Sequence, residues 1–214
     1  MELSKLRGIG PARLEQLKKA GIETIYDLLM VLPAGYHDTT VITPIQDLIP
    51  GEFCCVKGRL KAAPKTAHFR GITRVTASLK DVTGSIPLIW FNQPWVANQL
   101  NENDVIMLSG IPERDKQGRL RLNSPKRELE QKIYPVYKLT AGIPAAAFSK
   151  WMEQALTMLD ACCPESLPYD IRMRYGLCER NFSLRQIHCP ESMDALHIAQ
   201  RIAHRSLYNK LCKR

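Results

Sequence analysis

Two stretches decide the fold prediction: Val-Lys-Gly-Arg-Leu-Lys at residues 56–61 and Ile-Thr-Arg-Val-Thr-Ala-Ser-Leu-Lys-Asp at residues 72–81. In both, apolar side chains alternate with polar or basic ones, a period of two that is typical of strands with one buried face. The alternation places Lys57, Arg59 and Lys61 on one face of the first strand and Arg74 and Lys80 on one face of the second. The sequence therefore predicts a sheet with an apolar inner face and a basic outer face.

Three more short strands are expected, at residues 85–91, 105–111 and 119–123, with turn sequences at 81–84 and 115–118. Residues 95–100 leave room for a short helix between the third and fourth strands. Five short strands with a helix in that place is the order of an OB-fold barrel, whose strand faces and loops commonly bind single-stranded nucleic acid. We therefore expect an α+β protein with a five-stranded OB-fold barrel at residues 46–130.

Helical segments are predicted before this barrel, in residues 1–45. Gly8 and Gly10 lie in a short turn between two helical patterns, which predicts a helix-hairpin-helix-like segment. Pro11 suits the first turn of the second helix and Gly21 suits its end. A further helix begins at a capping box made by Thr24 and Asp27 and ends before Pro33, with an apolar face. That face consists of Ile25, Leu28, Leu29 and Leu32.

Residues 131–214 are predicted to form an extended segment at 134–137 and then a helical linker region. Two apolar stripes at helical spacing support the helices. The first stripe is Phe148, Trp151, Met152, Ala155, Leu156 and Leu159, and the second is Met193, Leu196, Ala199, Ala203 and Leu207.

Composition and the absence of common motifs limit the classes of protein to which this chain can belong. The chain of 214 residues has a net charge of +9 and is 45% hydrophobic, which predicts a folded protein rather than a disordered one. No apolar run approaches the roughly 20 residues of a membrane-spanning helix, and no signal peptide is evident, so we expect a cytoplasmic protein without membrane contact. No Walker A loop, Gly-x-Ser-x-Gly elbow or His-Glu-x-x-His motif is present, so no catalytic site is expected.

The seven cysteines fit neither a disulfide framework nor a zinc site, because their number is odd and no Cys-x-x-Cys motif occurs. A cluster of Cys178, His188 and Cys189 leaves a thiol or metal enzyme as a remote alternative. We expect free thiols and no bound metal.

Three sets of residues are candidates for function. Gly8 and Gly10 could offer backbone N–H groups to a DNA phosphate, or could simply form a tight connection between helices. The basic residues Lys57, Arg59, Lys61, Arg74 and Lys80 could follow a phosphate backbone as one stripe, or could be a solvated sheet face.

The aromatic residues at the end of the third strand form the last set. Because neighbouring side chains point to opposite faces of a strand, Trp90 and Phe91 cannot both enter the core. The spacing from Phe91 to Trp95 would allow both rings to stack on unpaired bases, although Trp95 could instead anchor the short helix to the barrel.

Several short motifs in fixed order resemble the bacterial RecG family of ATP-dependent DNA helicases. They include Leu6-Arg7-Gly8-Ile9-Gly10-Pro11, Asp81-Val82-Thr83-Gly84, Trp90-Phe91-Asn92-Gln93-Pro94-Trp95, Tyr134-Pro135-Val136-Tyr137 and Arg174-Tyr175-Gly176-Leu177. In that family an N-terminal wedge domain of OB type splits DNA strands at stalled forks and Holliday junctions, while two C-terminal motor domains translocate. The resemblance implies that Phe91 and Trp95 stack on bases at the junction. Where the family has His-Pro-Glu, this chain has Ser124-Pro125-Lys126.

The resemblance extends to about Leu207, and neither motor domain is present in the sequence, which could be a truncated piece or a natural remnant. We therefore expect binding of branched, forked or single-stranded DNA without unwinding, with ATP and magnesium needed only by a full-length parent. Contact with a single-stranded-DNA-binding protein is a further expectation. The alternative is an OB-fold adaptor in which the same rings meet a partner protein.

Overall fold

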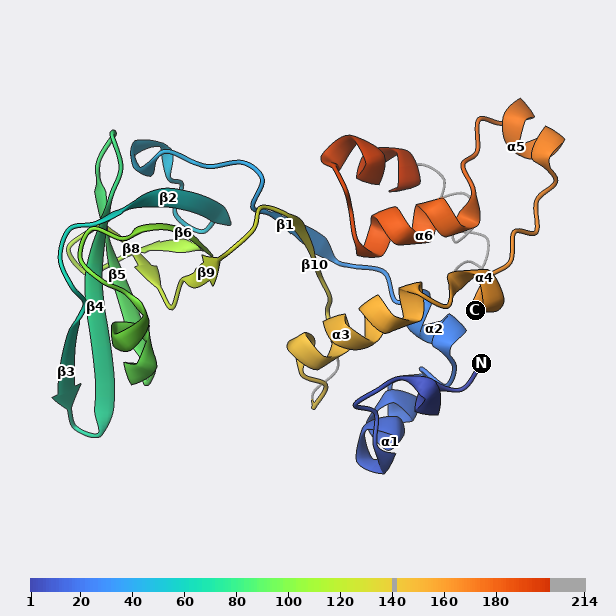
Figure 1. Cartoon of the computed structure of the whole chain (residues 1–214), viewed down its shortest axis with the longest axis horizontal. Coiled ribbons are helices and arrows are strands. Elements are labelled where there is room, and N and C mark those ends of the chain that lie inside the picture. The colour runs from blue at the N-terminus through green and yellow to red at the C-terminus, as the bar shows by residue number, and fades with distance from the viewer. Residues whose placement is uncertain (140–141, 201–214) are drawn as a thin grey trace. The chain divides into compact units, whose positions relative to one another are not determined.

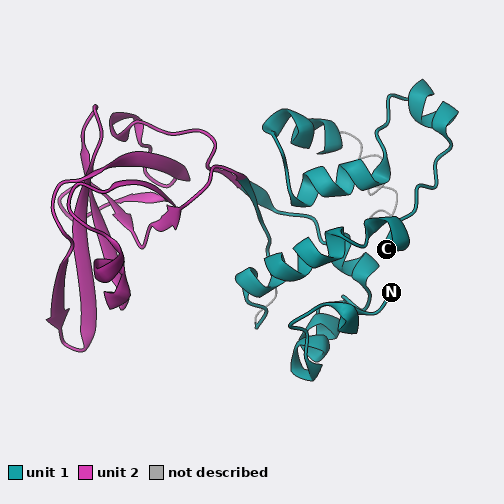
Figure 2. Cartoon of the chain, viewed as in Figure 1, with its two compact units in different colours: residues 1–36, 133–214 teal, residues 37–132 magenta. Residues whose placement is uncertain are grey.

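The computed structural model describes residues 1–139 and 142–200 and confirms the expected α+β class. The chain divides into two compact units, coloured separately in Figure 2. Unit 1 combines residues 1–36 with residues 133–214, and unit 2 consists of residues 37–132. The first and last of the three predicted regions therefore belong to one unit. Among residues 1–139 and 142–200, no helix combines the length and the apolar character that a membrane-spanning segment needs.

Unit 1 is mainly helical (Figure 1). Its helices are η1 (Leu3–Lys5), α1 (Pro11–Lys19), α2 (Ile25–Leu29), α3 (Ala145–Leu156), α4 (Leu159–Cys162), α5 (Tyr169–Arg174) and α6 (Arg180–His188). Residues 193–200 are also helical. Strands β1 (Gly35–Asp38) and β10 (Ile133–Val136) pair with each other where the chain passes between the units.

The predicted helix ends of unit 1 are largely confirmed. Pro11 is the first residue of α1, and the reciprocal hydrogen bonds between Thr24 and Asp27 form the expected capping box of α2. Two details are wrong. Only a three-residue 3-10 helix precedes Gly8, so a full helix-hairpin-helix is not formed, and α2 ends at Leu29, which leaves Leu32 exposed.

The core of unit 1 explains why distant segments combine. The predicted stripe, which covers α3 and continues to Leu159 at the start of α4, is buried and packs against apolar residues of η1, α1 and α2. Helices as short as α1 and α2 are marginal alone and need such tertiary packing. In the second stripe Leu196 and Ala199 are buried, whereas Ala203 and Leu207 lie outside the described residues.

Unit 2 contains the five predicted strands and three that the sequence analysis missed. The five are β2 (Cys54–Leu60), β4 (Ile72–Lys80), β5 (Ser85–Phe91), β6 (Val105–Gly110) and β8 (Leu120–Asn123). The missed strands are β3 (Lys65–Phe69), β7 (Pro112–Arg114) and β9 (Lys126–Glu128). Two 3-10 helices, η2 (Ile45–Asp47) and η3 (Pro94–Gln99), complete the unit, and η3 occupies the predicted helical position.

The strands follow the order β7-β8-β5-β4-β2-β6-β9, and β3 pairs with β4 beside this path. A closed five-stranded barrel is not confirmed, because this hydrogen-bonded path has two open ends. The consecutive strands β8 and β9 lie on either side of Ser124 and Pro125. Ser124 adopts a left-handed φ of 46° and Pro125 has no N–H to donate, so the ladder is interrupted there.

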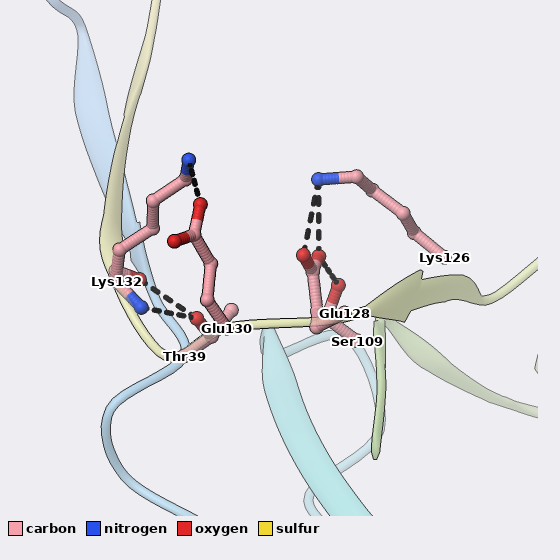
Figure 3. Close-up of polar contacts among 6 residues, drawn as sticks. All are labelled: Thr39, Ser109, Lys126, Glu128, Glu130 and Lys132. Carbon is pink, nitrogen blue, oxygen red and sulfur yellow. Dashed lines mark hydrogen bonds and ion pairs between the residues drawn. The ribbon is translucent and has the colours of Figure 1, made fainter. Parts of the chain in front are cut away.

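Polar contacts hold β9 and the end of unit 2 in place (Figure 3). The Ser109 hydroxyl donates to the buried Glu128 carboxylate at 2.6 Å, and the Lys126 ammonium lies 3.2 Å from the same group. Thr39 exchanges hydrogen bonds with the backbone of Lys132, donating its N–H at 3.0 Å and accepting at its hydroxyl at 2.9 Å. These bonds satisfy polar groups that burial would otherwise penalise.

Candidate nucleic-acid interface

The candidate site lies along strand β4, where buried apolar side chains alternate with exposed basic ones as predicted. Val75 and Leu79 are completely buried, whereas Arg74 and Lys80 point outward and are exposed. These two basic residues are about 20 Å apart along the strand, at the standard rise per residue. The predicted basic stripe is therefore divided between the two ends of β4.

One end of β4 lines a groove with a volume of about 760 Å³. Lys57, Arg59, Lys61 and Lys80 all line it, so four of the five predicted basic residues come together. Gly58 makes this possible, because a Cβ at that position would lie only 2.5 Å from the backbone oxygen of Lys80. The close crossing of β2 and β4 places Arg59 directly opposite Lys80.

Like charges on directly opposite residues destabilise a strand pair unless an anion lies between or beside them. Arg59 is held by a hydrogen bond to the backbone oxygen of Asn103 at 3.1 Å, and Lys61 donates to the Ser85 hydroxyl at 3.2 Å. Both partners are neutral, so the positive charge stays uncompensated by these contacts. The groove is suited to a phosphate backbone.

The carboxylate that lines this groove, Asp81, is bound to the adjoining turn. Burial acts to raise its pKa, but hydrogen bonds from the N–H groups of Ile45, Thr83 and Gly84 and from the Thr83 hydroxyl lower it to about 2. These donors fix the expected turn at residues 81–84 and occupy the carboxylate oxygens.

The other end of β4 carries the aromatic residues. Phe91 lies opposite Arg74 and is 43% exposed, while Trp95 on η3 is 53% exposed. Trp90 is buried, and its indole N–H donates to the Pro125 carbonyl oxygen at 3.0 Å. The prediction that Trp90 and Phe91 face opposite ways is confirmed. The exposure of Trp95 disfavours the alternative in which its ring anchors η3.

Asn92 positions the turn that connects Phe91 to Trp95, a role that was not predicted from the sequence. It has a left-handed φ of 54°, which turns the chain out of β5. Its N–H donates to the Thr73 carbonyl at 2.7 Å, and its side-chain oxygen accepts from the Thr73 N–H at 3.1 Å. The reciprocal pair joins the turn between Phe91 and Trp95 to β4. An Asn directly after a predicted strand was the available signal.

The hairpin formed by β3 and β4 was also missed. Arg70 and Gly71 both have positive φ, of 48° and 78°, as a two-residue type I′ turn requires. All five residues of β3 are exposed, so the burial alternation that reveals other strands is absent. The charge pattern indicates an exposed basic segment here more clearly than alternation does. The stretch from Lys57 to Lys80 contains seven Lys and Arg residues and no Asp or Glu.

Gly8 and Gly10 lie in unit 1, where the loop between η1 and α1 packs against α3. The Arg7 N–H donates to the side-chain oxygen of Gln154 at 2.7 Å, and a Cβ on Gly8 would lie 3.5 Å from the Trp151 indole nitrogen. Gly8 has a φ of 88°, which favours glycine. These contacts account for the loop as a helix connection, and contact with a phosphate stays a prediction.

The cysteine and histidine cluster has little capacity for catalysis or metal binding. The His188 Nε2–H donates to the Leu29 carbonyl at 2.8 Å, and its Nδ1 accepts from the Tyr137 hydroxyl at 2.9 Å, so both ring nitrogens are used. Burial lowers the pKa of His188 to about 4 and raises the pKa of the Cys178 thiol. Among the described residues no group of three potential metal ligands is found.

Comparison with known proteins agrees with this architecture. The family model for the RecG wedge domain matches residues 2–159. The chain is 30% identical to the ATP-dependent DNA helicase RecG of Thermotoga maritima over 97% of its length, and 32% identical to that of Staphylococcus aureus strain MRSA252 over 93%. It spans 28% and 30% of these relatives. A solved structure of RecG bound to a three-way DNA junction matches 98% of this chain, and 30% of its own, with a TM-score of 0.82 and 28% identity.

Proposed function

This chain belongs to the family of RecG wedge domains, and we propose that it binds branched DNA by stacking Phe91 and Trp95 on unpaired bases at the junction. The observation that carries the proposal is the exposure of Phe91, which lies opposite Arg74 at the end of a strand whose other aromatic residue is buried, together with the exposure of Trp95 on the following helix η3. Exposed aromatic side chains that adjoin one another commonly mark a binding surface.

Two kinds of contact cooperate in this proposal. The groove at the Lys80 end of β4 binds phosphates without regard to base sequence, and binding there weakens as salt increases. The rings at the Arg74 end stack on bases, and each contributes about 1–3 kcal/mol. Stacking is available only where bases are unpaired, so the rings give a preference for junctions over plain duplex.

The chain alone offers binding without unwinding. Because it spans less than a third of its curated relatives, we assign remodelling of stalled forks and Holliday junctions, together with the need for ATP and magnesium, to a full-length RecG-like helicase. Within such a helicase this chain would keep the separated strands from pairing again. No cofactor is assigned to the chain itself.

The test compares the affinity of the 214-residue chain for a three-way fork and for duplex DNA of equal length. Wild type should prefer the fork, and Phe91→Ala and Trp95→Ala should each reduce fork affinity roughly tenfold while leaving duplex affinity unchanged. Tyr175→Ala is the matched control, because this aromatic residue of unit 1 is 56% exposed. Equal affinity for both DNAs, unaffected by either substitution, contradicts the proposal.

The same exposed rings also support a second candidate, an OB-fold adaptor that binds a partner protein such as a single-stranded-DNA-binding protein. In that case Phe91→Ala would weaken the protein complex in a pull-down, and DNA binding by the chain would be weak and indifferent to branching. Measuring both ligands with the same two variants separates the candidates.

A further inference from the structure

The outer face of the β3–β4 hairpin continues the surface that carries Phe91. Strand pairing places Phe91, Arg74 and Ala67 in one row across β5, β4 and β3. Two residues nearer the turn on each strand, Ile72 pairs with Phe69, so this second row lies on the same face as the first. Figure 1 shows β3 and β4 joined by this turn. Phe69 and Phe91 are thus roughly 12 Å apart by the standard spacing of strands and residues.

Neither apolar side chain of that second row is covered. Phe69 is 70% exposed and Ile72 is 48% exposed, although both lie on a regular strand pair. Burying rings of this size against a partner is strongly favourable, and single exposed apolar residues become informative when they adjoin others. With Phe91 they form one group of exposed apolar side chains at this end of β4, and the helix η3, which carries the exposed Trp95, contacts both β3 and β4.

The charge around the hairpin identifies the partner. Lys65, Arg70 and Arg74 are exposed on the hairpin, and it contains no acidic residue. The Arg70 guanidinium lies 5.1 Å from the centre of the Phe69 ring, which keeps a cation beside the ring. A ligand with flat apolar groups joined by negative charges fits this arrangement, and unpaired DNA bases joined by phosphates have that chemistry.

We propose that Phe69 and Ile72 form a second base-contacting site, which extends the stacking surface of Phe91 and Trp95 along the hairpin and takes further unpaired bases of one DNA strand. Arg74, in the first row between Phe91 and Ala67, and Arg70, beside Phe69, neutralise the phosphates that link those bases. A span of roughly 12 Å accommodates a run of about three or four bases stacked about 3.4 Å apart. The inference rests on the proposed function and adds residues and strand length to it.

The experiment measures binding of the 214-residue chain to forks whose unpaired arm is two or eight thymidines long. Wild type should bind the longer arm more tightly, and Phe69→Ala should remove most of that gain, with a roughly tenfold loss on the longer arm and little loss on the shorter. Ile72→Ala should have a smaller effect in the same direction. Phe69→Trp, unlike Phe69→Ala, should bind the longer arm as tightly as wild type, because the larger ring stacks on a base at least as well.

Thr66→Ala is the matched control, since Thr66 lies on the same exposed strand with its side chain on the opposite face. If Phe69→Ala binds the long arm as Thr66→Ala does, while Phe91→Ala still weakens binding, the inference fails and the proposed function stands. If neither Phe variant affects binding, both fail. A change in sedimentation with unchanged DNA affinity would instead assign Phe69 to contact between copies of the chain and would overturn the inference.

Discussion

The aromatic residues around His188 in unit 1 and those at the Arg74 end of β4 in unit 2 lie in opposite environments. In the first group Phe148 is completely buried against Tyr137, and the Tyr137 hydroxyl donates to His188. In the second group Phe91, opposite the cation Arg74, and Trp95 are both about half exposed. Where every polar atom near a ring has a protein partner, the ring stabilises the fold. Where the ring and the nearby charge both face solvent, as at Phe91 and Arg74, they can both contact a ligand.

This comparison also assigns roles to residues that resemble one another in sequence. Tyr137 lies in one of the motifs that resemble the RecG family, as do Phe91 and Trp95, yet Tyr137 is half-buried and hydrogen-bonded to His188 whereas Phe91 and Trp95 are exposed. Burial raises the pKa of Tyr137 and lowers that of His188, which keeps both groups neutral at pH 7. We therefore expect changes at the first group to affect stability and changes at the second to affect DNA affinity.

The largest effect is expected from acidification, which acts on the His188 group. The pKa of His188 is about 4 in the fold and ordinarily 6.5, so between these values the unfolded chain binds the proton more readily. The free energy of unfolding therefore has its full value above pH 6.5 and decreases by roughly 3 kcal/mol as the pH falls to 4, because protonation of His188 favours the unfolded chain. Urea unfolding at about pH 7, 5.5 and 4.5 measures it, and hydrogen exchange should locate the loss in α6 rather than in β4.

His68→Gln is the control for this pH series, because His68 is an exposed histidine of unit 2. It should leave the pH dependence of unfolding unchanged. If the pH dependence disappears in this variant, or if β4 loses protection before α6, the contrast between the two groups is mistaken.

A smaller effect is expected at Asn92, which positions the exposed rings. In Asn92→Ala the Thr73 N–H loses its acceptor and an alanine must adopt a φ of 54°. Either effect costs about 1–2 kcal/mol, and we expect fork affinity to fall roughly fivefold to tenfold as Phe91 and Trp95 lose their fixed geometry. Fluorescence anisotropy with labelled forks measures the change.

Asn92→Gly separates the two causes, because glycine accepts the left-handed φ but still lacks the side-chain oxygen. The loss of fork-binding free energy in Asn92→Gly should be about half of the loss in Asn92→Ala. Fork affinity equal to wild type in both variants would show that the rings need no positioning from this turn.

Much of the fold could be predicted because local patterns agree with tertiary packing. Alternation in residues 72–81 correctly separated buried Val75 and Leu79 from exposed Arg74 and Lys80, and the capping box at Thr24 correctly located the start of α2. Strand alternation also showed that Trp90 and Phe91 must face opposite ways, and base stacking by Phe91 and Trp95 was predicted both from their spacing and from the family resemblance.

The features that were missed depend on interactions between distant residues or on unusual backbone geometry. Strand β3 buries none of its side chains, so no periodicity marks it. The interruption between β8 and β9 depends on a left-handed Ser124, which propensity does not reveal. The separation of Arg74 from the four basic residues of the groove follows from strand length and register, whereas alternation alone placed all five on one face.

The smallest effect is expected in the groove, where the double variant Arg59→Gln with Lys80→Gln removes the two facing charges. Each cation that is removed leaves one DNA phosphate with its bound counterion. The magnitude of the slope of log affinity against log salt should therefore fall by about 0.7–0.9 per substituted residue, and by about 1.5 for the double variant. Near physiological salt the affinities for fork and duplex should fall together by only a few-fold, leaving their ratio unchanged. Phe91→Ala should do the reverse, altering the ratio but not the slope. A groove variant that changed the ratio would show that the two ends of β4 do not act on separate parts of the DNA.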